Sequence, residues 1–111
     1  MKVERYAIHW VNLDPTIGSE INKTRPAVVV SDNSMNNNLK TIVVCPLTSS
    51  IHPNWRSRIQ IAVRDKKAEI VVDQIRTISK QRIGGKIGKL TTEDSLKLQI
   101  IITEMYGTGS K

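Results

Sequence analysis

Two short runs of branched apolar residues place the strongest constraint on the fold: Pro26 to Ser31 and Thr41 to Leu47. The turn-forming pair Asp32-Asn33 follows the first run, and a polar stretch separates the two. Such runs are typical of strands that are covered on both faces. An earlier segment, Tyr6 to Leu13, mixes aromatic and branched residues and ends at the turn signal Asp14-Pro15. The first half of the chain is therefore predicted to consist mainly of strands.

The second half continues the strand pattern. Arg58 to Val63 alternates in part, and Ile70 to Ile78 begins as an apolar run and then alternates. The polar pair Asp73-Gln74 predicts a kink within the second of these segments. Ser34 to Asn38 is expected to form a turn or a single helical turn, and the glycine-rich segment Gly84 to Gly88 is expected to be a flexible connector.

The hydrophobic period changes near the C-terminus. Thr91 and Asp94 form the pattern of a capping box. An amphipathic helix of about 14 residues is predicted to follow and to stop at Gly107. Its apolar face is expected to consist of Leu98, Ile101, Ile102 and Met105. The tail, residues 107–111, is expected to be flexible.

A chain of 111 residues has room for one domain with its own core. Several short strands and one terminal helix predict a mainly β (α+β) domain that spans residues 1–111. The expected architecture is a small, strongly bent barrel capped by the helix.

The net charge of +7 is concentrated in one segment. Residues 56–89 carry ten basic and three acidic side chains, whereas residues 1–50 carry five and four. This imbalance indicates a polyanionic partner, either nucleic acid or an acidic protein.

Other classes of protein are disfavoured. No apolar run approaches the roughly 20 residues of a membrane span, and no signal peptide is recognisable, so a cytoplasmic protein is expected. The single cysteine, Cys45, lies in an apolar run and is expected to serve packing. His9 lies in a predicted strand and His52 precedes Pro53, which disfavours a catalytic histidine pair. Neither a metal-ligand motif nor a carboxylate cluster is present, so no metal or cofactor is expected.

Three polar residues at strand ends or kinks are candidates for function. Arg25 precedes Pro26, which restricts it to extended geometry beside a buried strand. Thr48 ends the second apolar run, and Asp73 lies at the predicted kink. Each also has a purely structural interpretation. Arg25 would pair with Glu20 or Asp73, Thr48 would be an ordinary strand-end hydroxyl, and Asp73 would cap a turn.

Aromatic residues are scarce, and the chain has no Phe. It therefore lacks the aromatic strand face on which many RNA-binding modules stack bases. A basic barrel of this kind would bind RNA through phosphates and polar pockets. Trp55 either stacks on a base or lies at an interface. The four aromatic residues are Tyr6, Trp10, Trp55 and Tyr106.

Taken together, these motifs resemble the MazF/PemK-type toxins of bacterial toxin-antitoxin modules. The family pattern has Pro, Gly and Glu in a first loop, Arg-Pro before a buried strand, and a later strand that ends in Pro-Leu-Thr-Ser. It continues with Asp-Gln-Ile-Arg-Thr-Ile, and the likeness covers about residues 5–105. The matching positions are Pro15, Gly18, Glu20, Arg25-Pro26, Asn33, Pro46 to Ser49 and Asp73 to Arg82.

The resemblance implies an SH3-like barrel of about five to seven antiparallel strands that works as a homodimer. It implies a sequence-specific, metal-independent endoribonuclease, an mRNA interferase, that cuts single-stranded RNA. Family members cleave by attack of the ribose 2′-hydroxyl on the adjacent phosphate. The catalytic pair matches Arg25 and Thr48. The expected partner is an acidic antitoxin whose first half binds DNA and whose other part occupies the RNA groove.

Further site residues follow from the same resemblance. Some relatives use an Asp at the position of Asp73 as base, with Arg and His where this chain has Val71 and Ser19. Because that Arg and that His are absent here, the resemblance favours Arg25 and Thr48. Asp73 and Gln74 stay candidates for catalysis or RNA binding. The other expected RNA contacts are Ser19, Glu20, Asn33 and Ser49.

Two other functions suit the same barrel. One is that of a non-catalytic gyrase inhibitor similar to CcdB, and the other is that of a passive RNA-binding barrel. A CcdB-type protein depends on the end of its C-terminal helix, and the segment Gly107 to Lys111 lacks the Trp-Gly-Ile ending. The endoribonuclease is therefore favoured.

Overall fold

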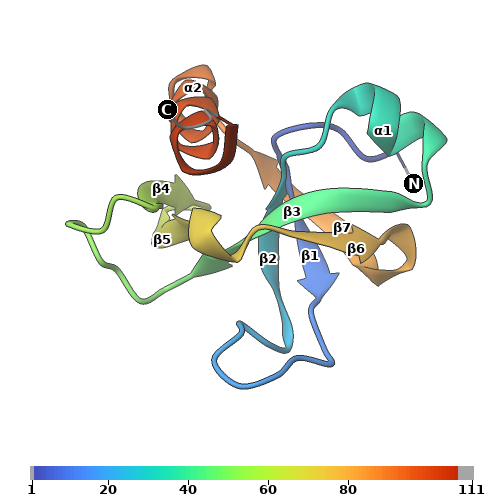
Figure 1. The fold of residues 1–111 in the computed structure, drawn as a ribbon, viewed down its shortest axis with the longest axis horizontal. Coiled ribbons are helices and arrows are strands. Elements are labelled where there is room, and N and C mark those ends of the chain that lie inside the picture. Colours follow the sequence, from blue (N-terminus) through green and yellow to red (C-terminus); the bar gives the residue numbers. More distant parts are fainter. Residues whose placement is uncertain (1, 108–111) are drawn as a thin grey trace.

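The sheet of the computed structural model has seven strands and is strongly curled, with a helix packed beside it near the C-terminus (Figure 1). Residues 2–107 are described. The elements are β1 (Ala7–Asn12), β2 (Thr24–Val29), α1 (Asn33–Asn38), β3 (Thr41–Thr48), β4 (Arg58–Val63), β5 (Lys66–Val71), the 3-10 turn η1 (Val72–Gln74), β6 (Arg76–Ser79), the 3-10 turn η2 (Lys80–Arg82), β7 (Ile83–Lys89), α2 (Thr92–Ile102) and the π turn η3 (Thr103–Gly107). The mainly β prediction is confirmed.

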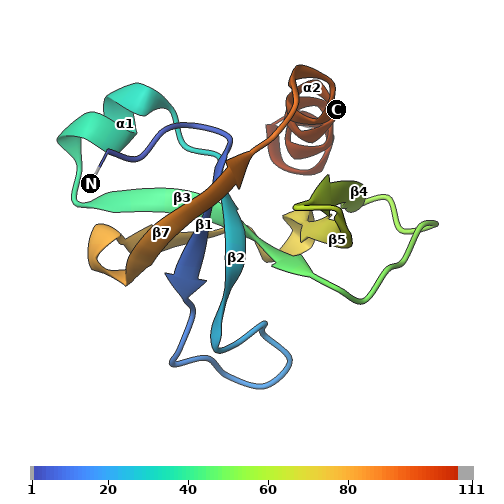
Figure 2. The ribbon, with the colours of Figure 1, turned by 180° about the vertical axis from the view of Figure 1, so that it is seen from behind.

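β3 is the centre of the architecture. Along the main path the strands follow the order β4-β5-β3-β2-β1-β7, all antiparallel, and β6 pairs with the first half of β3. β3 therefore pairs with β6 at its start, with β2 in its middle and with β5 at its end. Figure 2 shows β7 crossing β1 and leading into α2.

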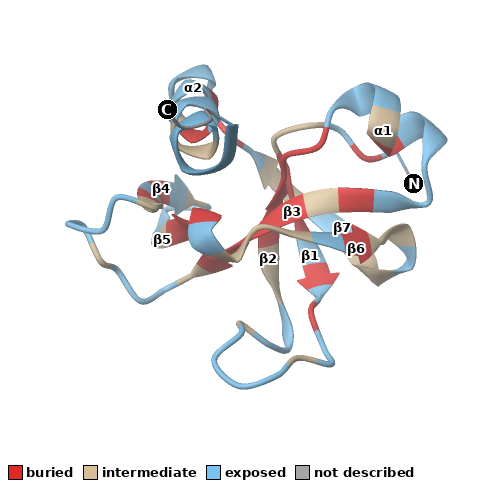
Figure 3. Ribbon diagram, viewed as in Figure 1, coloured by how far each residue is buried: buried red, intermediate tan, exposed pale blue. Residues whose placement is uncertain are grey.

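The apolar runs of the first half pack on both faces of the sheet. Successive residues of β2 alternate between two buried clusters, since Ala27 and Val29 belong to one and Val28 to the other. Figure 3 shows the buried residues concentrated along β1, β2 and β3. This arrangement explains why the strands read as continuous apolar runs.

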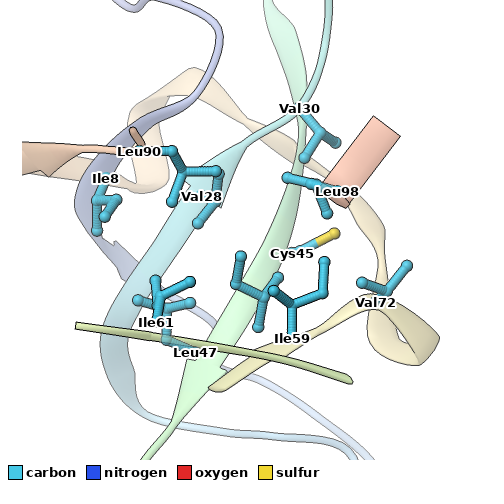
Figure 4. Packing of buried hydrophobic residues seen from close by; sticks show 11 residues of the cluster. Ile8, Val28, Val30, Cys45, Leu47, Ile59, Ile61, Val72, Leu90 and Leu98 are labelled. Atoms are coloured by element: carbon cyan, nitrogen blue, oxygen red, sulfur yellow. The ribbon is translucent and has the colours of Figure 1, made fainter. Parts of the chain in front are cut away.

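One of the two clusters lies between the sheet and α2 (Figure 4). Leu98 of α2 is fully buried there, against residues that include Cys45 of β3. Burial raises the pKa of the Cys45 thiol to about 12, and the negative charge of Asp73 contributes. The predicted packing role of Cys45 is confirmed.

The glycine-rich segment is a strand, so its prediction as a flexible connector is wrong. β7 covers it and pairs with β1 through two register shifts. Glycine suits this strand because β7 approaches β1 closely. A Cβ atom added at Gly84 would lie 3.4 Å from Trp10 Cβ and from the Trp10 carbonyl oxygen. The local glycine signal indicated a loop, but the pairing with β1 decides the conformation.

β5 begins earlier than predicted. It starts at Lys66 and forms a hairpin with β4. The two turn residues, Arg64 and Asp65, both have positive φ, as the tight turns between adjacent antiparallel strands require. Neither is the glycine or asparagine that usually marks such a turn, so no local signal predicts the hairpin. The predicted kink at Asp73-Gln74 is confirmed as η1.

α2 has 11 residues and is therefore shorter than expected. Its predicted cap is confirmed, since Thr91 Oγ1 accepts a hydrogen bond of 3.1 Å from the Asp94 amide. The π turn η3 follows and changes the helical phase, so Met105 is 39% exposed and does not continue the buried face. Gly107 belongs to η3, and residues 108–111 of the predicted flexible tail lie outside the described residues. Among residues 2–107 no helix is long and apolar enough to cross a membrane.

Candidate active site

The antiparallel pairing of β2 with β3 brings Arg25 and Thr48 together. Ala27 pairs with Pro46, and continuing this register by two residues places Arg25 opposite Thr48. Both residues line one cavity of about 380 Å³. Two residues 23 positions apart in sequence thus share one wall because each lies at the end of its strand that faces the loops.

The cavity combines apolar walls with a cationic rim. Arg25, Arg64 and Lys66 lie around it, and no carboxylate is among its lining residues. The apolar walls come from five strands, β1, β3, β4, β5 and β7, through Trp10, Leu47, Val63, Ala68 and Ile87. Such a lining suits an anion that is attached to a flat or apolar group. A nucleotide has this chemistry.

The guanidinium of Arg25 is positioned but not neutralised. Its Nε donates a hydrogen bond of 2.9 Å to the Asn22 carbonyl oxygen, and its pairing with Val11 holds the backbone in β2. No ion pair of Arg25 with Glu20 or Asp73 is formed within residues 2–107. Instead, Glu20 accepts a hydrogen bond from the Ile17 amide, at 2.6 Å. The interpretation of Arg25 as a surface ion-pair partner is therefore wrong.

The hydroxyl of Thr48 keeps its hydrogen available. Thr48 Oγ1 accepts a hydrogen bond of 3.1 Å from the Ser50 amide, which turns the chain away from β3. Because the hydroxyl acts as acceptor in that bond, its own hydrogen is free to be donated to a ligand. Ser49, another predicted contact, lines the same cavity.

Asp73 and Gln74 lie in η1 and hold the two loops that flank the cavity. Asp73 Oδ1 accepts hydrogen bonds of 2.8 Å from Ser57 Oγ and from Arg58 Nε, both at the end of the β3–β4 loop. Gln74 Oε1 accepts one of 2.8 Å from the Ile21 amide in the β1–β2 loop. Both residues line a second cavity of about 260 Å³, not the one with Arg25.

The protonation of Asp73 follows from these bonds. Burial alone would raise the pKa of the Asp73 carboxyl, but the hydrogen bonds from Arg58 and Ser57 hold the pKa below its usual value. Asp73 is thus an ionised carboxylate whose Oδ1 accepts two strong donors. A carboxylate with a lowered pKa is a weak general base at neutral pH.

A buried carboxylate that was not among the predicted site residues supports this arrangement. Glu69 of β5 is fully buried, and its side chain binds the loop before β4. Its Oε2 lies 2.7 Å from Arg58 Nη1, and its Oε1 accepts hydrogen bonds from the His52 amide (2.6 Å) and from Gln60 Nε2 (2.8 Å). Burial raises the pKa of Glu69, but these donors lower it below its ordinary value. The charged residues that begin the strand, Lys66 and Lys67, are exposed, so no local pattern marks Glu69 as buried.

The other predicted RNA contacts are dispersed. Ser19 and Glu20 are exposed in the β1–β2 loop, and Glu20 lines the second cavity. Asn33 is at the start of α1, where its Oδ1 accepts a hydrogen bond of 2.8 Å from the Arg5 amide. α1 lies at the opposite end of β3 from Thr48 (Figure 1). Within residues 2–107 no three His, Cys, Asp or Glu side chains converge as metal ligands.

The chain matches the model of a known protein family. The family described as PemK-like, MazF-like toxin of type II toxin-antitoxin system matches residues 4–106. The chain belongs to this MazF/PemK toxin family. The resemblance on which the sequence interpretation relied is confirmed.

Two characterised relatives are named for their activity. Endoribonuclease EndoA of Bacillus subtilis (strain 168) is 31% identical over 98 residues, which are 84% of each chain. Endoribonuclease MazF9 of Mycobacterium tuberculosis (strain ATCC 25618 / H37Rv) is 33% identical over 107 residues, which cover 86% of this chain and 89% of that protein.

Solved MazF structures share the fold. MazF from Deinococcus radiodurans superposes with a TM-score of 0.84 at 17% identity, covering 96% of this chain and 98% of that one. A mycobacterial endoribonuclease in complex with its cognate antitoxin gives 0.80 at 18% identity, covering 98% and 99%. The MazF fold is therefore the fold of this chain, and the SH3-like barrel prediction is confirmed.

Proposed function

We propose that this protein is an endoribonuclease, the toxin of a toxin-antitoxin module, and that it cuts single-stranded RNA at a short sequence without a metal ion. The observation that carries the proposal is that Arg25 and Thr48, from the neighbouring strands β2 and β3, line one cavity with a cationic rim. Relatives more than 30% identical, over most of their length, are endoribonucleases by name.

The reaction is transesterification within the RNA chain. The 2′-oxygen of a ribose forms a bond to the adjacent phosphorus, the bond from phosphorus to the 5′-oxygen breaks, and a cyclic phosphate and a 5′-hydroxyl result. The 2′-hydroxyl loses a proton and the leaving oxygen gains one. Negative charge grows on the non-bridging oxygens as the transition state forms.

Arg25 acts on that charge. Its guanidinium starts from a backbone fixed by β2, makes no ion pair within residues 2–107 and faces the cavity. Donors placed in advance where charge develops are worth about 10²- to 10³-fold in rate for each donor removed. Stabilisation of the phosphate is its main role. Protonation of the leaving oxygen is secondary, because a guanidinium has a pKa above about 12 and gives up its proton poorly.

Thr48 fixes the reacting phosphate. Its hydroxyl donates a hydrogen bond to a phosphate oxygen opposite Arg25. The Ser50 amide donates to Thr48 Oγ1 and so fixes the orientation of the hydroxyl. An unaided hydroxyl is a poor base, so the proton of the 2′-hydroxyl leaves to another group. Asp73 and Gln74 serve by holding the flanking loops, and Ser19, Glu20 and Ser49 line the path of the RNA.

Two kinds of protein contact belong to the proposal. The first is a homodimer, supported by exposed apolar side chains on the outer face of α2, where Leu96 is 53% and Ile100 is 57% exposed. The second is an acidic antitoxin, supported by the ten basic side chains of residues 56–89. An endoribonuclease of the same fold, from a mycobacterial species, has been solved in complex with its cognate antitoxin.

The test is cleavage of a long single-stranded RNA by the purified protein in EDTA, followed by mapping of the ends. The expected result is cuts at one short sequence with 5′-hydroxyl ends, lost in Arg25→Ala and Thr48→Val. Matched controls are Lys40→Ala and Thr41→Val, which change exposed residues at the opposite end of β3. Intact RNA at high protein concentration would refute the proposal, as would cuts that persist in both variants.

A further inference from the structure

The loop between β3 and β4 holds an exposed tryptophan in a fixed orientation. The amide of Trp55 donates to the His52 carbonyl oxygen (3.1 Å), and its own carbonyl oxygen accepts from the Arg58 amide (3.2 Å). The His52 ring stacks on the indole with centroids 3.9 Å apart at 20°. The Arg58 guanidinium carbon lies 4.6 Å from the indole centroid. Even so, Trp55 is 51% exposed.

Both contacts lie on the same side of the indole. His52 Nδ1 is only 3.3 Å from Arg58 Nη1. Groups on opposite faces of a ring would be separated by about the sum of their distances from its centre, far beyond this value. Neither group covers the second face of Trp55, and the high exposure of the residue is accounted for by that open face.

We propose that the open face of Trp55 is a stacking platform for a base of the bound RNA, upstream or downstream of the scissile phosphate. This inference rests on the proposed function and identifies a further RNA-binding residue. Every base has a flat π face, so stacking on an indole binds single strands with little dependence on sequence. The indole is already held by His52 and Arg58, which Glu69 binds in turn, so little conformational freedom is lost on binding.

The position of the loop favours RNA as the occupant. Trp55 follows Thr48 by seven residues, so the two lie within about 25 Å of each other even along a fully extended chain. The loop between β3 and β4 contains no acidic residue, and its one cation, Arg56, is 71% exposed and pairs with Glu104 at 3.3 Å. Ser49, at the start of that loop, lines the cavity with Arg25. An RNA strand bound at the cavity is therefore within reach of this loop and of the indole of Trp55.

The experiment compares binding of a short RNA that contains the mapped cleavage site, with a 2′-deoxy nucleotide at the scissile position so that it is not cut. Trp55→Leu is expected to weaken binding about 5- to 150-fold, the range for one stacked base, and Trp55→Phe to restore most of it. With cleavable RNA, KM is expected to rise while kcat stays nearly constant. The matched control is Leu39→Ala, an exposed apolar residue beside α1.

A second measurement does not depend on the leucine variant folding. The chain has two tryptophans, Trp10 and Trp55, so the difference in fluorescence between the native protein and Trp55→Phe reports on Trp55. Saturating RNA is expected to quench its fluorescence and to shield it from a soluble quencher. Unchanged affinity in Trp55→Leu, or unchanged fluorescence on binding, would refute the stacking role of Trp55. Cleavage by the native protein would still support the proposed function in that case. Loss of the dimer or of antitoxin binding with RNA affinity intact would also overturn it, since the face would then be a protein contact.

Discussion

Glu69→Gln is a sharp test of the physical account, because it changes one charge and almost no volume. The side chain of Glu69 is fully buried and receives two hydrogen bonds and an ion pair, all within 2.8 Å. In the variant an NH₂ group replaces one acceptor oxygen and faces other hydrogen-bond donors. Arg58 also loses its nearest anion. The side chain of Arg58 is itself only 9% exposed.

The magnitude follows from this burial. Removing one partner of a buried ion pair costs about 3–5 kcal/mol, because the other charge stays buried and uncompensated. Arg58 keeps Asp73 as a second partner at 2.8 Å, so we expect the lower end, about 3 kcal/mol. At about 4 °C per kcal/mol for a domain of this size, Tm falls by about 12 °C.

The assay is urea unfolding at pH 7 and equal protein concentrations, followed by tryptophan fluorescence. The matched control is Glu93→Gln, the same chemical change in a side chain that is 79% exposed and pairs with Lys97 at 3.6 Å. The control is expected to show no measurable change in the free energy of unfolding. If Glu69→Gln unfolds at the same urea concentration as the control, the account of this network is wrong.

The pH dependence adds an independent check. The folded-state pKa of Glu69 lies below its ordinary value of 4.5, so the carboxylate stabilises the fold at higher pH and this stabilisation is lost as pH falls through the folded-state pKa. Glu69→Gln has no such group. The difference in stability between the native protein and the variant is therefore expected to shrink below about pH 4.5.

Three further outcomes are expected. Cys45 is buried with a thiol pKa raised to about 12, so a thiol reagent should react only after unfolding in urea; rapid labelling of the native protein would contradict its placement. Thr91→Ala removes the helix cap and should cost about 1 kcal/mol, or roughly 4 °C in Tm. Gln74→Ala frees the Ile21 amide and should raise KM for RNA more than it lowers kcat, whereas Gln74→Glu keeps the acceptor and should change KM little.

The branched apolar residues that follow one another along β2 and β3 made the core predictable. Their continuous apolar runs require two covered faces, and that condition places Arg25 and Thr48 at the ends of neighbouring strands. The catalytic pair was predicted through family resemblance, since nothing local distinguishes Thr48 from an ordinary strand-end hydroxyl.

Features that depend on distant contacts were not predictable. β7 forms because it pairs with β1, which approaches Gly84 closely, and Glu69 is buried because Arg58, Gln60 and His52 neutralise and bind it. Neither condition leaves a local pattern. The role of η1 in holding both loops is likewise a property of the assembled fold, since its partners lie 15 to 53 positions away.

The central claim is that Arg25 and Thr48 act on the reacting phosphate rather than merely bind RNA. The most direct measurement is single-turnover cleavage of a saturating, mapped RNA by Arg25→Ala and Thr48→Val, beside the affinity of each variant for the 2′-deoxy analogue. If both side chains act on the phosphate, the cleavage rate falls by about 10²-fold or more while the affinity changes far less. A cleavage rate that stays at the native value once the RNA is bound would contradict it.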